Sequence, residues 1–133
     1  MMRKYPRCTN EEDLLFNDDV SDEDKETVLD HAKMAGQLIK TFPKCPMGAD
    51  MIITQHHGMT SGKGFAVNYK DDISPLSKIM IISEHAASYV LTKLEERDKE
   101  KYNNNAEIMQ QLESRYKSYT YKKIITAFAE VEL

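Results

Sequence analysis

From residue 21 to the C-terminus, apolar positions recur at the spacing of α-helices. Ser21 is a typical N-cap residue, and the acidic residues at 22–24 favour the positive end of a helix dipole. The pattern predicts a first helix from Ser21 to shortly before Pro43, because a proline disfavours helical conformation in the residue that precedes it. A second, shorter helix is predicted from Gly48 to the doublet His56–His57.

Three further helices are predicted in the second half of the chain. Ser74 and Pro75 are typical of the N-cap and first position of a helix, and this long helix is expected to end at the charge run 95–101. Two more helices are predicted at about 106–117 and 121–131. The chain contains no strand pattern, internal repeat or domain linker. The predicted fold class is therefore all-α, a compact bundle of about five helices.

Residues 58–64 follow the histidine doublet and have no apolar periodicity, which predicts a loop. The glycines at 58, 62 and 64 are expected to allow positive φ angles in a tight turn. The run is not a phosphate-binding P-loop. It is one residue short, has glycine where that motif needs serine or threonine, and follows a helix instead of a strand.

The first 20 residues differ from the remainder because they are rich in acidic and polar residues around one apolar cluster at 14–16. We interpret residues 1–20 as an N-terminal tail or lead-in and residues 21–133 as the helical domain. The apolar cluster is expected to pack against another surface, which could be a segment upstream of this chain.

Composition limits the class of protein. A chain of 133 residues with 41% apolar and 30% charged residues is expected to form one soluble domain with a single core. The net charge of −4 argues against binding of a nucleic-acid polymer. No apolar run approaches a membrane span and no signal peptide is evident, so we expect a cytoplasmic protein with no membrane partner. Cys8 and Cys45 form no metal or redox motif.

Candidate chemistry rests on the histidines. His31 lies on the inward stripe of the first helix, His56 and His57 end the second, and Glu84 lies on the third. Metal sites need imidazoles or carboxylates that converge from separate elements, and packed helices could bring these groups together. A structural role stays open for each histidine, because neighbours in a helix point about 100° apart and a lone histidine is commonly a hydrogen-bonded core residue. His85 is interpreted as structural or solvent-facing.

The run from Gln55 to Ala66 resembles the signature of the HD-GYP family, in which a histidine doublet is followed by Glu-x-x-Asp-Gly-x-Gly-Tyr-Pro. The doublet at 56–57 and the glycines at 62 and 64 match without a gap. Upstream, the run from His31 to Gly36 is similar to the family's His-x-x-x-x-Gly element, and downstream the helix leading to Glu84 is similar to the stretch before its last metal-binding aspartate. The resemblance covers about residues 20–131.

The resemblance implies a helix bundle that holds metal ions, commonly iron or manganese, and hydrolyses cyclic di-GMP. By resemblance, His31, His56 and His57 would ligate one metal, with Glu84 in place of an aspartate. Lys63 and Lys93 are the candidates for contact with substrate phosphate. The implied partners are a cyclic dinucleotide, if the site is intact, and a protein partner or a second copy of the chain.

The chain also departs from the family. It has no His-Asp dipeptide, and the ligands that precede the position of His31 in the family are missing. Gly58 stands at the family's glutamate, Ser61 at its aspartate, and Phe65–Ala66 at Tyr-Pro. Catalytic residues are therefore unknown, and hydrolysis by this chain alone is not expected. Three interpretations stay open: the C-terminal half of a phosphohydrolase domain, an inactive HD-GYP-like signalling or interaction module, and a helical adaptor with structural histidines.

Overall fold

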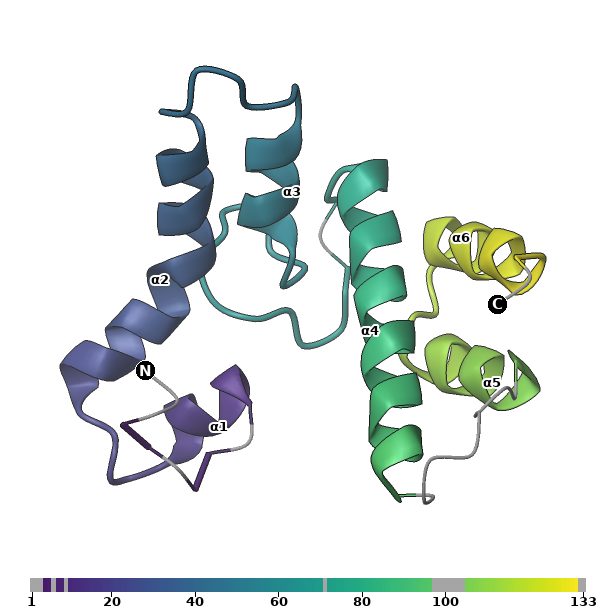
Figure 1. Cartoon of the computed structure of the whole chain (residues 1–133), viewed down its shortest axis with the longest axis horizontal. Coiled ribbons are helices and arrows are strands. Elements are labelled where there is room, and N and C mark those ends of the chain that lie inside the picture. The colour runs from purple at the N-terminus through teal and green to yellow at the C-terminus, as the bar shows by residue number, and fades with distance from the viewer. Residues whose placement is uncertain (1–3, 6, 9, 71, 97–104, 132–133) are drawn as a thin grey trace.

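The helices of the chain pack as two groups that meet along α3 and α4 (Figure 1). The computed structural model describes residues 4–5, 7–8, 10–70, 72–96 and 105–131, and in these ranges it contains helices only. The helices are α1 (Glu11–Phe16), α2 (Asp22–Ile39), α3 (Ala49–Gln55), α4 (Pro75–Glu96), α5 (Asn105–Arg115) and α6 (Tyr119–Ala129). The all-α class is confirmed, and α2 to α6 correspond to the five predicted helices.

The predicted helix starts follow from local capping. The Ser21 hydroxyl accepts a hydrogen bond from the Asp24 N–H (3.2 Å) at the start of α2. At α4 the Ser74 hydroxyl accepts from the Ser77 N–H (3.1 Å). Each bond satisfies one of the N–H groups that a helix start leaves without an intrahelical partner. The end predicted for the long helix lies mostly in 97–101, outside the described residues.

Helix α1 was not predicted and lies within the segment interpreted as a lead-in. Asn10 forms a capping box with Asp13: its side chain accepts from the Asp13 N–H (2.9 Å), and its own N–H donates to the Asp13 carboxylate (3.2 Å). Leu14 is 1% exposed and packs in a small apolar cluster with Cys8 and Val28, whereas Phe16 is 84% exposed. The lead-in therefore docks on α2 through buried Leu14, with Leu15 partly buried against the same cluster.

The larger core lies among α4, α5 and α6 and contains buried Ile82, Ile108, Leu112, Tyr121 and Ile125. A polar contact joins it to the first half of the chain. The side-chain carbonyl of buried Gln55, the last residue of α3, accepts from the Ser74 N–H (2.8 Å) and from the Ser77 hydroxyl (2.9 Å) at the start of α4. These bonds fix the end of α3 against α4.

Helices α2 and α3 approach closely at a glycine. A Cβ atom on Gly36 would lie 2.0 Å from the Thr54 hydroxyl oxygen and 2.9 Å from the Asp50 carbonyl oxygen, so the two helices touch with no room for a larger residue. This contact sets the spacing of the helices that carry the histidines.

The glycine loop binds the turn of α2 that contains His31. The Gly64 N–H donates to the Leu29 carbonyl (2.7 Å), and the Lys33 N–H donates to the Gly62 carbonyl (3.2 Å). The three loop glycines have φ between 75° and 84°, which confirms their predicted conformation. Leu29 and Lys33 are four residues apart, so their carbonyl and N–H groups are the pair that a regular α-helix joins by a hydrogen bond. The loop bonds to both groups, and such an insertion into the hydrogen bonds of a helix is a common cause of helix bending. Figure 1 shows α2 changing direction along its length.

None of the helices in the described part of the chain combines the length and hydropathy that a transmembrane segment requires.

Candidate metal centre

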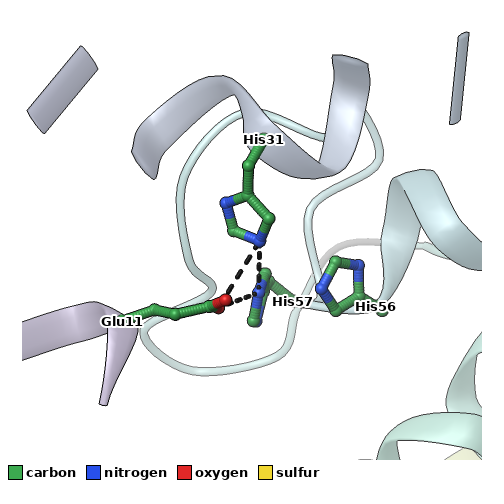
Figure 2. A group of neighbouring side chains, drawn as sticks. All are labelled: Glu11, His31, His56 and His57. Carbon is green, nitrogen blue, oxygen red and sulfur yellow. Dashed lines mark hydrogen bonds and ion pairs between the residues drawn. The ribbon is translucent and has the colours of Figure 1, made fainter. Parts of the chain in front are cut away.

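Three imidazole rings converge between α2, the end of α3 and the loop (Figure 2). The Nε2 atoms of His31 and His57 lie 3.0 Å apart. The ring centroids of His31 and His56 are 5.4 Å apart, and those of His56 and His57 are 3.9 Å apart. The histidines that sequence alone left as separate possibilities therefore form one group.

A carboxylate from α1 completes the group. The Glu11 Oε2 atom lies 3.0 Å from His57 Nε2 and 3.4 Å from His31 Nε2. One ligand atom from each of Glu11, His31, His56 and His57 lies within 4.8 Å of the other three. We refer to these four residues as the histidine group. They come from three separate elements, as a metal site requires.

Backbone carbonyls fix the orientation of two of the rings. His31 Nδ1 lies 2.5 Å from the Val28 carbonyl oxygen, and His56 Nδ1 lies 2.5 Å from the Ile53 carbonyl oxygen. A carbonyl oxygen only accepts, so Nδ1 carries the proton in both rings, and in the neutral imidazole Nε2 has the free lone pair. This arrangement is the usual support of metal-binding histidines.

His57 is held in the neutral form that binds metals. Its side chain is 20% exposed and packs against the Phe65 ring at a centroid distance of 4.3 Å, with the ring planes tilted by 50°. Burial, followed by the charges that His56 and His31 carry when protonated, lowers the pKa of His57 to about 3. An imidazole with such a pKa carries a lone pair at neutral pH.

The four residues fit a metal ion better than they fit hydrogen bonding among themselves. A neutral His57 has one N–H, yet its Nε2 faces both the His31 lone pair and the Glu11 carboxylate at 3.0 Å. One proton cannot be donated well to both acceptors. In a tetrahedral zinc site with bonds of about 2.0–2.1 Å, neighbouring ligand atoms lie about 3.3–3.4 Å apart. The separations of 3.0 to 3.4 Å among Glu11, His31 and His57 are close to that value, and one ligand atom of His56 lies within 4.8 Å of theirs.

The other residues singled out from the sequence lie outside this group. Glu84, expected to supply the carboxylate, is exposed on α4 and is not part of the group, whose carboxylate belongs to Glu11. His85 Nδ1 lies 3.1 Å from the Tyr116 hydroxyl, in agreement with a structural role.

The two candidate phosphate-binding lysines have partners of their own. Lys63 Nζ lies 2.7 Å from the Glu26 carboxylate and 3.8 Å from that of Asp30, both on α2, so its charge is balanced by neighbouring acids. Lys93 Nζ lies over the Tyr89 ring, 5.6 Å from its centroid.

Glu11 was missed because a six-residue helix is too short to show apolar periodicity. The run from Asn10 to Asp13 carries a capping-box pattern that could have predicted the start of α1. It could not have indicated that the carboxylate meets the histidines, because that depends on how α1 docks.

No family model, curated protein or solved structure matches this chain.

Proposed function

We propose that this chain is a metal-binding module that holds one divalent transition-metal ion through the histidine group. The observation that carries the proposal is the convergence of His31 Nε2, His57 Nε2 and Glu11 Oε2 within 3.4 Å of one another. Three imidazoles and one carboxylate suit Zn²⁺ and Fe²⁺ better than the hard cations Mg²⁺ and Ca²⁺. The resemblance to the HD-GYP family adds iron and manganese as candidates.

The HD-GYP resemblance also suggests what the metal serves. A bound divalent ion would polarise a phosphoryl oxygen as a Lewis acid. Hydrolysis of cyclic di-GMP in that family uses adjacent metals, whereas the described part of this chain brings together a single group of metal-ligand type. We therefore propose an HD-GYP-like module with one ion that does not turn over cyclic di-GMP by itself.

The test of the metal site is elemental analysis and titration calorimetry with Zn²⁺, Fe²⁺ and Mn²⁺ on chelator-treated protein. We expect one ion per chain. His57→Ala should weaken binding by more than 100-fold, because even a group that only supports a ligand contributes about 10–100-fold. His85→Ala is the matched control and should bind like the wild type. Absence of metal from the wild type, or equal affinity in His57→Ala, would refute the site.

A second function, protein interaction without chemistry, is favoured by the exposed apolar side chains. On α2 and α4 these include Met34, Leu38, Leu76, Ile79 and Met80. Large apolar side chains mark a contact with another protein or another copy where they form one exposed patch. Light scattering coupled to size exclusion would detect self-association, and Leu38→Ser should reduce it. A monomer at every concentration would exclude self-association.

A further inference from the structure

Helix α1 cannot hold its position by helix propensity. It has six residues, whereas isolated helices shorter than about 12–15 residues are marginal in water. Its position therefore depends on tertiary contacts. Two kinds of contact bear on the metal site: the apolar contacts of Leu14 and Leu15 in the small cluster, and the contact of Glu11 with the histidine group.

The two kinds of contact share one side chain. Phe65 packs against the apolar cluster that holds Leu14. The same ring lies 4.3 Å from the His57 ring and 6.0 Å from the His31 ring, measured between centroids. The docking surface of α1 and the metal ligands are therefore adjacent parts of one packed region.

Glu11 is the least restrained member of the group. Its side chain is 49% exposed, against 28% for His31 and 20% for His57. His31 and His56 are further fixed by their bonds to backbone carbonyls. Without an ion, the carboxylate contacts the two imidazole nitrogens His57 Nε2 and His31 Nε2, at 3.0 and 3.4 Å. A divalent ion at the same place would attract it strongly.

We propose that metal binding at the histidine group and docking of α1 are coupled through Glu11, which makes the N-terminal segment a metal-dependent strap. The proposal rests on the metal site argued above. Docked, α1 supplies the fourth ligand and covers the apolar surface around Val28. Released, it leaves three imidazoles and one position open to an external ligand, the arrangement of a reactive site instead of a closed one. Thermodynamic linkage makes this coupling reciprocal. If metal binding strengthens the docking of α1 by a given factor, docking of α1 strengthens metal binding by the same factor.

Hydrogen exchange of the full chain, followed by mass spectrometry with and without Zn²⁺, tests the coupling. Zn²⁺ should slow exchange in residues 11–17 by about 5–150-fold, the usual range of coupling between two sites. In Glu11→Gln this protection should disappear, while residues 53–58 remain protected by the ion on the histidines. Glu12→Gln removes the neighbouring carboxylate and should behave like the wild type.

The reverse direction is tested by Leu14→Ala, which removes the buried anchor of α1 without touching a ligand. Its zinc affinity should fall by about 5–150-fold. Leu112→Ala, an equal truncation in the α4–α6 core, is the control and should leave zinc affinity unchanged in folded protein, as checked by circular dichroism. Bound zinc with unchanged exchange in 11–17, or Glu11→Gln behaving like Glu12→Gln, would refute the strap alone. Absence of bound zinc would refute the metal site and the strap together.

Discussion

The contact between Gly36 and α3 gives a prediction whose size follows from the structure. In Gly36→Ala the new Cβ atom would lie 2.0 Å from the Thr54 hydroxyl oxygen, which in turn donates to the Asp50 carbonyl at 2.8 Å. Rotation of Thr54 would relieve the first contact and lose that bond, at a cost of about 1 kcal/mol. The Asp50 carbonyl oxygen, 2.9 Å from the Cβ atom, belongs to the backbone, so α3 itself must also shift.

Two opposing contributions determine the net effect. Alanine favours a helix over glycine by about 1 kcal/mol. Overpacking of a tight contact costs about 1–3 kcal/mol, to which the lost hydrogen bond adds. We therefore expect Gly36→Ala to lower the free energy of unfolding by about 1–3 kcal/mol. It should also weaken metal binding, because the histidine doublet follows directly after α3.

Urea unfolding followed by circular dichroism measures the change, and a double-mutant cycle assigns its cause. In a Thr54→Ala background the hydroxyl is absent, so Gly36→Ala should cost about 1–2 kcal/mol less than in the wild type. If Gly36→Ala is as stable as the wild type, or costs the same in both backgrounds, the close approach of α2 and α3 is not what limits this position.

Two further predictions concern pH and metal removal. Asp24 accepts hydrogen bonds from Lys4 and Tyr5, and these bonds, chiefly the one from Lys4, lower the pKa of its carboxyl group from 3.8 to about 2. The contribution of Asp24 to stability is therefore present above pH 3.8 and is lost as the pH falls towards 2. The free energy of unfolding should fall more steeply over that window in the wild type than in Asp24→Asn, and parallel profiles would contradict the role of Asp24. A metal at 100 times its Kd should stabilise the fold by about 2.7 kcal/mol. A chelator should therefore lower the melting temperature of the wild type and leave that of His57→Ala unchanged. An equal shift in both proteins would contradict the assigned ligands.

The sequence by itself determined the elements that depend on neighbouring residues. Ser21 and Ser74 marked the starts of α2 and α4, because a serine side chain caps the N–H groups of its own helix. The loop glycines 58, 62 and 64 have the positive φ angles expected of them. Apolar periodicity predicted five of the six helices found in the described residues, since that signal lies within each helix. The His56–His57 doublet and His31 were identified as candidates by residue type and spacing.

Only the tertiary structure decided how these candidates meet. The choice of Glu11 over Glu84 depends on the docking of a six-residue helix through Leu14, a contact that no local pattern encodes. Lys63 was a candidate for contact with phosphate by resemblance, and only the fold shows that α2 places Glu26 and Asp30 beside it. A metal site requires ligand atoms to converge within a few ångströms. That precision comes from the packing of α2 on α3 and from the bonds of the loop to α2, whereas capping and periodicity act only along one helix.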